Sequence, residues 1–181
     1  IKGGEYTVIF GRQSVADLLN NLILPSLSLS TFYCDSSPFM GRLGKRVASR
    51  QLTLYDHGNK RGLMGSKGIT CEGLPTGKTR LIQRGRLVGL LTNYYERQRI
   101  LKDPRGAEKL GVDPNQHGNA IVPRNGFRFG AGGGRQFSVQ AAVAPTNAVV
   151  QGGDQSLEEL IATVKDGLLI GTSEKEKESL F

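Results

Sequence analysis

The segment that most constrains the fold runs from Cys71 to Arg97 and contains two short apolar runs on either side of a glycine turn. The runs are Arg80–Gln83 and Leu87–Leu91, and Arg84-Gly85-Arg86 separates them. Gly85 can adopt the positive φ that a tight turn requires. Apolar runs of this length around such a turn are typical of an antiparallel hairpin. The sequence therefore predicts a hairpin that the rest of the chain extends or covers.

The turn before this hairpin has the composition of a phosphate-binding loop but not its geometry. The segment reads Gly73-Leu74-Pro75-Thr76-Gly77-Lys78-Thr79. A phosphate loop has four residues between its glycines and leads into a helix, so that consecutive backbone N–H groups converge on the phosphate. Here only three residues intervene, Pro75 removes one N–H, and a strand pattern follows. We therefore expect a turn and no nucleotide site.

Length and composition favour one turn-rich domain. The chain has 181 residues, of which 38% are hydrophobic and 25 are glycine. Such a chain is long enough to bury a core, and many glycines with few long periodic runs favour β structure over a helical bundle. No apolar run has the length of a membrane span. Two cysteines, Cys34 and Cys71, do not form a disulfide framework, so we expect a reducing, cytoplasmic location.

The chain is basic, with a formal net charge of +8 and a pI of about 9.7. A basic surface can bind nucleic acid by neutralising phosphates. Here the cationic residues are spread from Arg42 to Arg135 without a Lys/Arg block, and aromatic residues are only 7% of the chain. Scattered surface charge is therefore the simpler interpretation, and nucleic-acid binding stays as the alternative.

The first elements are predicted to be a strand and an amphipathic helix. Tyr6–Phe10 is β-branched and aromatic, as strands are. Ser14 is a suitable N-cap, and Pro25 is expected to end the helix. The helix would carry an apolar stripe. Its members are Val15, Leu18, Leu19 and Leu22, of which Leu18 and Leu22 are expected to be buried.

The remaining elements are read from local signals in chain order. Ser26–Thr31 is expected to be a linker, and Gln51–Tyr55 a strand closed by the turn Asp56-His57-Gly58-Asn59. A capping box, Ser156 with Glu159, opens a helix to about Lys165. The other predicted elements are a helical turn at Ala107–Leu110 and strands at Asn147–Val150 and Leu168–Ile170.

Few residues suggest catalytic or metal chemistry. His57, His117, Cys34 and Cys71 are far apart in sequence and form no pair at metal-ligand spacing, so we predict no metal and no cofactor. His57 is read as a surface turn residue and His117 as a loop residue bonded to backbone. The glycine-rich segment Gly126–Arg135 is read as a surface loop, with an anion-binding backbone nest as the alternative.

The hairpin residues also carry a family resemblance. The pattern is Glu72-Gly73-x-Pro75 followed by Leu81-Ile82-x-x-Gly85-x-Leu87-x-Gly89-x-Leu91-Thr92. It resembles the C-terminal domain of the TldD/PmbA family, which is also labelled modulator of DNA gyrase and peptidase U62-like. The resemblance covers about residues 5–170, with 171–181 as a charged tail, and it implies a fragment of a larger bacterial subunit. The implied fold is α+β, with curved antiparallel sheets and a few short helices.

The resemblance also bears on chemistry. Catalytic members carry His-Glu-x-x-x-His on the helix that matches Gly11–Asp17, and this stretch contains no His and no Glu. A metal-binding cysteine of those members falls where this chain has its charged tail. The chain thus resembles the metal-free PmbA-like subunit. Members act as a heterodimeric peptidase on unfolded peptides, including a microcin leader and an antitoxin, so activity of this chain alone is not expected.

The implied partners are a catalytic TldD-like paralogue, or a second copy of the chain, and a peptide substrate. Asn115–Ala120 resembles a family loop near the cleft. We therefore take His117, Asn119 and Arg124 as candidates for peptide or partner contact, with no catalytic, metal or cofactor residue. Two other functions stay open: a basic nucleic-acid- or gyrase-associated binding module, and a peptidase with an unfamiliar site.

Overall fold

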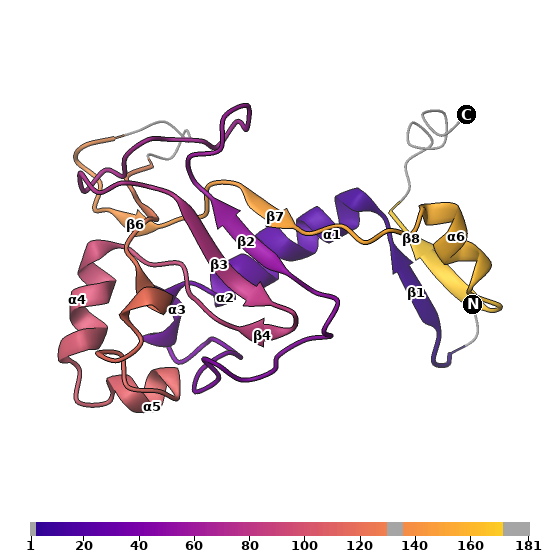
Figure 1. The fold of residues 1–181 in the computed structure, drawn as a ribbon, viewed down its shortest axis with the longest axis horizontal. Helices are drawn as coiled ribbons and strands as arrows, with labels where there is room; N and C mark the ends of the chain where they lie inside the picture. Colours follow the sequence, from indigo (N-terminus) through magenta and orange to yellow (C-terminus); the bar gives the residue numbers. More distant parts are fainter. Residues whose placement is uncertain (1–2, 130–135, 172–181) are drawn as a thin grey trace. The chain divides into compact units, whose positions relative to one another are not determined.

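A computed structural model describes residues 3–129 and 136–171 (Figure 1). The chain divides into two compact units. One contains Ile1–Ile23 and Gly152–Phe181, and the other contains Leu24–Gln151. The charged tail beyond Gly171 and residues 130–135 of the glycine-rich segment lie outside the described residues.

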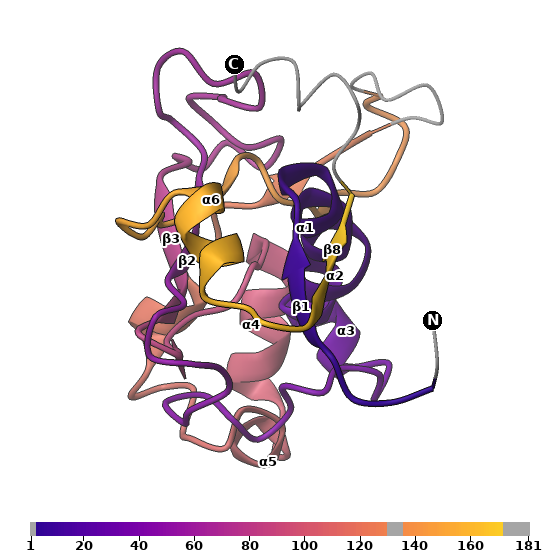
Figure 2. The ribbon, with the colours of Figure 1, turned by 90° about the vertical axis from the view of Figure 1, so that its right-hand side faces the viewer.

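The smaller unit joins segments from near both ends of the chain. Strand β1 (Thr7–Phe10) pairs in parallel with β8 (Gly167–Ile170), with Thr7 opposite Gly167 (Figure 2). Helix α6 (Leu157–Ala162) begins with the predicted capping box, because Ser156 Oγ accepts from the Glu159 N–H at 3.2 Å and the Glu159 carboxylate accepts from the Ser156 N–H at 2.7 Å. Both strands and the helix start are thus confirmed, although α6 ends before Lys165.

The first helix differs from its prediction. Helix α1 (Arg12–Leu18) begins after Gly11 instead of Ser14, and a π-helical turn, η1 (Leu19–Ile23), follows. Leu18 and Leu22 are 41% and 59% exposed, so their predicted burial is wrong for this chain. A periodic stripe shows that one face is apolar but not what covers it, and the π turn changes the spacing of the side chains.

Pro25 does not end the helical segment. It lies within α2 (Leu24–Ser26), which continues directly from η1, and the helical run ends one residue after it. The predicted linker Ser26–Thr31 is also wrong in part. It contains Leu27 and the start of α3 (Leu29–Phe32), and Leu27 is fully buried.

The larger unit is built on a four-stranded antiparallel sheet in the order β4-β3-β2-β7. The strands are β2 (Leu54–His57), β3 (Lys78–Gln83), β4 (Arg86–Leu87) and β7 (Ala148–Val150). A second antiparallel pair joins β5 (Gly126–Phe127) to β6 (Ala142–Val143). The predicted turn at Asp56-His57 is wrong, because both residues belong to β2 and the turn comes at Gly58-Asn59.

The predicted hairpin is confirmed, with a two-residue loop. Arg84 and Gly85 have φ of 47° and 75°, which matches the loop type that favours glycine, and Gln83 pairs with Arg86. Gly85 is buried, and a side chain there would meet the backbone oxygens of residues 48 and 49. The second strand stops at Leu87, earlier than predicted, because the N–H groups of residues 88 and 89 both donate to Leu81 O.

Short helices complete the described part of this unit. Besides α2, they are α3, α4 (Tyr94–Lys102), α5 (Gly106–Leu110) and the 3₁₀ turn η2 (Gly118–Ile121). Two side chains cap α4: Asn93 Oδ1 accepts from the Glu96 N–H at 2.8 Å, and Glu72 Oε2 accepts from the Tyr94 N–H at 2.9 Å. Glu72 of the sequence pattern therefore has a structural role.

The core lies between the sheet and these helices. Its fully enclosed side chains are mostly leucines from the sheet and from the segments that cross it. They include Leu24, Leu27, Leu29, Phe32, Leu54, Leu81, Leu87, Leu90, Leu91, Ile100, Leu110, Ile121 and Phe127. The expected fold class, α+β with antiparallel sheets and short helices, is confirmed. Within the described parts of the chain, no helix is long and apolar enough to cross a membrane.

Replacing Leu81 tests this core. Leu81 is 0% exposed on β3, so Leu81→Ala should lower the free energy of unfolding by about 2–5 kcal/mol through lost transfer energy and a cavity. The matched change Leu22→Ala, at an exposed leucine, should cost no more than about 0.5 kcal/mol. Urea unfolding followed by circular dichroism measures both. Equal losses in the two variants would contradict this placement of the core.

Candidate functional site

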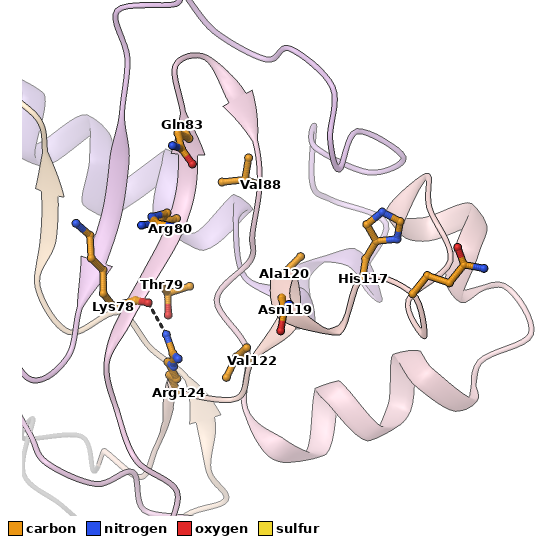
Figure 3. Close-up of a pocket in the computed structure, with 11 residues that line it drawn as sticks. Lys78, Thr79, Arg80, Gln83, Val88, His117, Asn119, Ala120, Val122 and Arg124 are labelled. Atoms are coloured by element: carbon orange, nitrogen blue, oxygen red, sulfur yellow. Dashed lines mark hydrogen bonds between the residues drawn. The ribbon is translucent and has the colours of Figure 1, made fainter.

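A groove of about 690 Å³ lies in the larger unit, between β3 and the segment that follows α5 (Figure 3). Strand β3 contributes one side. The other side comes from the segment of residues 116–124, which includes η2, and Val88 adds to the lining. Most of the residues that line it are polar, so the groove is suited to a polar ligand.

All the described Lys, Arg, Asp and Glu side chains that line the groove are cations. Lys78, Arg80 and Arg124 line it, and none of the described residues in its lining is a carboxylate. Lys78 lies at the rim, with its ammonium 3.8 Å from the centre of the Tyr55 ring in a cation–π contact. Arg80 is exposed on β3. A concave surface with only cations concentrates positive potential and attracts anions.

Arg124 is held in place by its neighbours. Its guanidinium donates a hydrogen bond to Lys78 O and lies against Gly77, where a side chain would touch it. The next residue, Asn125, is 0% exposed. Its backbone N–H donates to Thr92 O at 3.0 Å, so the chain has little freedom at this point.

Asn125 in turn depends on a buried carboxylate. Asn125 Nδ2 donates to Asp56 Oδ2 at 2.7 Å and to Ala144 O at 3.0 Å. Asp56 is 1% exposed, and it also accepts from the Thr146 N–H and the Thr146 hydroxyl, both at 2.8 Å. Such a network satisfies a buried charge and joins three distant segments. Sequence reasoning missed it, because these partners lie 69 and 90 positions from Asp56.

One buried hydroxyl of β3 lacks a partner among the described residues. Thr79 is 7% exposed, and its Oγ1 has no hydrogen bond to any described residue. Most buried polar groups are hydrogen-bonded, and an unpaired one is costly.

The three candidate residues named from the sequence line this groove together (Figure 3). His117 is exposed and its Nδ1 lies 3.0 Å from Asp113 O, which confirms a loop histidine bonded to backbone. Asn119 lies in η2 and Arg124 follows it. Their part in peptide or partner contact stays a prediction. Arg80 was not among the candidates named from the sequence, although polar residues that alternate with apolar ones along a strand do mark its exposed face.

No metal centre is found in the part of the chain that the structure describes. No group of three or more His, Cys, Asp and Glu residues is close enough there to hold an ion. His57 is half-buried on β2 instead of lying in a turn, with its ring 6.3 Å from that of Tyr55. Cys34 is exposed and Cys71 half-buried, and both are free.

The sequence of this chain from residue 3 to residue 176 matches the PmbA/TldA metallopeptidase C-terminal domain. The chain therefore belongs to this family. A metalloprotease TldD homolog of Haemophilus influenzae is 29% identical over 136 residues, which are 74% of this chain and 23% of that protein. A metalloprotease TldD homolog of Buchnera aphidicola is 27% identical over 167 residues, which are 91% of this chain and 29% of that protein.

Solved structures share the fold. TldE from Thermococcus kodakarensis has a TM-score of 0.65 at 26% identity, covering 90% of this chain and 31% of its own. A candidate modulator of a DNA gyrase from Thermotoga maritima has a TM-score of 0.67 at 21% identity, covering 93% and 32%. This chain thus spans between 23% and 32% of the length of these relatives.

The support of Arg124 can be tested at Asn125. Asn125→Ala should lower the free energy of unfolding by about 1–3 kcal/mol, because it leaves the buried Asp56 short of a donor. Asn115→Ala is the control, since Asn115 is exposed and its side-chain amide donates to the carboxylate of half-buried Asp113 at 3.3 Å. It should change stability by about 0.5 kcal/mol or less. Comparable losses in both variants, measured by urea unfolding, would show that the network does not stabilise the fold.

Proposed function

We propose that this chain is part of a non-catalytic, metal-free subunit of a TldD/PmbA-type metallopeptidase, which binds unfolded peptide without hydrolysing it. The proposal rests on the amino-acid sequence of α1 and of Gly11, the residue before it. In catalytic members the matching helix carries His-Glu-x-x-x-His, whereas Gly11–Asp17 contains neither His nor Glu.

Zinc-dependent hydrolysis sets clear requirements. The metal needs protein ligands that leave one position open, and a general base must lie near the bound water. Asp17 is the single carboxylate of this segment, and its Oδ1 accepts a hydrogen bond from Gln13 Nε2 at 2.9 Å. One carboxylate cannot supply three ligands and a base. The residues of α1 therefore favour a subunit that assists catalysis by another chain.

The relatives support the choice of partner. Two matched proteins are named metalloprotease TldD homologs, and one matched structure is named TldE. We propose that a catalytic TldD-like paralogue is the partner, with self-association as the alternative, in the cytoplasm. The proposal gives this chain the role of completing a peptide-binding chamber around the partner's metal.

The groove on β3 supports peptide binding. Gln83, Gln116 and Asn119 line it, and each side-chain amide can donate and accept, as a peptide backbone does. The basic charge of +8 favours a second candidate, a nucleic-acid-binding module. That candidate is weaker, because no Phe, Tyr or Trp is among the described residues that line the groove, and bases bind single-strand sites by stacking on such rings.

Peptide cleavage by this chain, by the catalytic paralogue and by their mixture tests the proposal. This chain alone should release no product from an unstructured peptide, because it supplies no activated water. The mixture should cleave faster than the paralogue alone, and a chelator should abolish the activity. Product formation is followed by mass spectrometry.

The matched control is a paralogue in which the glutamate of His-Glu-x-x-x-His is replaced by glutamine. Mixed with this chain, it should cleave nothing, which assigns the chemistry to the paralogue. Chelator-sensitive cleavage by this chain alone at high purity would overturn the proposal. Absence of any gain on mixing would count against the partnership.

A further inference from the structure

We infer that the groove on β3 binds an acidic segment of an extended peptide, through Arg80 and Arg124 with Lys78 at the rim. This inference rests on the proposed function in that it names the substrate class of a peptide-binding subunit. The groove itself, however, is defined by residues of this chain alone. Its ligand can therefore be tested without a catalytic partner.

The charge of the groove is not balanced by its own lining. Three cations line the groove without a described carboxylate to neutralise them, whereas charged surface residues are commonly of mixed sign. The described salt bridges lie elsewhere, at residues 96 and 99, 105 and 108, and 35 and 109. The guanidinium of Arg80 is thus free of an acidic partner among the described residues. Arginine donates to carboxylates in a bidentate geometry, so a carboxylate is a fitting ligand.

One cation of the groove has a fixed position. Arg124 is bonded to Lys78 O and precedes Asn125, which the Asp56 network holds. A guanidinium that is already ordered loses less conformational entropy when a ligand binds. One side of the groove therefore offers a pre-positioned donor, and Arg80 offers an adaptable one.

Polar side chains complete the lining. They include the amides of Gln83, Gln116 and Asn119. Peptide N–H and C=O groups can pair with these amides. The groove thus offers partners for both the side chains and the backbone of an acidic peptide.

The lining of the groove favours a peptide over a nucleic acid. Tyr55 is the aromatic residue beside the rim, and the Lys78 ammonium covers its ring at 3.8 Å. No described Phe, Tyr or Trp lines the groove to stack on a base. Cations with amides and without such rings favour carboxylates on a peptide.

The strand geometry suggests the probe. Lys78 and Arg80 leave β3 on the same exposed side, two residues apart, which corresponds to about 6.6 Å along a strand. An extended peptide repeats its side chains at the same interval. The probe is a fluorescent peptide with glutamate at alternate positions, acetylated and amidated at its ends so that no terminal carboxylate contributes. Its isostere carries glutamine at those positions.

Fluorescence anisotropy with the 181-residue chain gives the result. The glutamate peptide should bind at least about tenfold tighter than the glutamine peptide, and Arg80→Gln should remove about tenfold of that affinity, as expected for a lost charge-assisted hydrogen bond. Arg61→Gln is the matched control, since Arg61 is exposed, is not in the lining and carries the same charge. It should leave binding unchanged, and coincident melting curves establish that each variant is folded.

Several outcomes would overturn the inference. These are equal binding of the two peptides, equal losses in the Arg80 and Arg61 variants, and tighter binding of a single-stranded oligonucleotide that depends on Arg80. The last result would assign the groove to nucleic acid. Failure of the cleavage experiment would leave these binding results unaffected, so the two proposals can fail separately.

Discussion

Much of the larger unit depends on the hydrogen bonds that the buried carboxylate of Asp56 accepts. A charge removed from water is stable only when hydrogen-bond donors replace the water. Here the donors come from Asn125 and from the backbone and hydroxyl of Thr146. The middle of β2, the residues before β5 and the turn before β7 must therefore assemble together. Displacing the segment of Asn125 or that of Thr146 removes part of the hydrogen bonding of this charge.

This constraint extends to the groove. Asn125 belongs to the network and Arg124 precedes it, so the guanidinium reaches β3 from a fixed point of the backbone. The opposite wall is the hairpin strand, which is fixed by its two-residue loop and by the buried Gly85. Both walls are thus parts of the rigid framework, and such an arrangement suits a site whose donors must be in place before the ligand arrives.

The features predicted from sequence are those with local causes. The hairpin follows from Gly85 between two apolar runs, and the start of α6 follows from Ser156 and Glu159, three residues apart. The features that were not predicted depend on contacts between residues far apart in the sequence. Asp56 looked like a turn residue because its donors are far away in sequence, and Leu22 looked buried because a stripe does not reveal what lies over it. Three residues of the groove lining were named from the family resemblance, and Arg80 was not, because it comes from another element, far away in sequence.

The parallel pairing of β1 with β8 has a consequence for the order of assembly. Thr7 and Gly167 are about 160 residues apart, and closing so large a loop carries an entropic cost before any contact stabilises it. During synthesis the residues of the larger unit, Leu24–Gln151, are complete before β8 leaves the ribosome. Strand β1, which is synthesised first, therefore lacks its pairing with β8 during this time. Nascent chains of this domain would therefore pass through a stage at which an aggregation-prone strand is exposed while the sheet that bears the groove can already be in place.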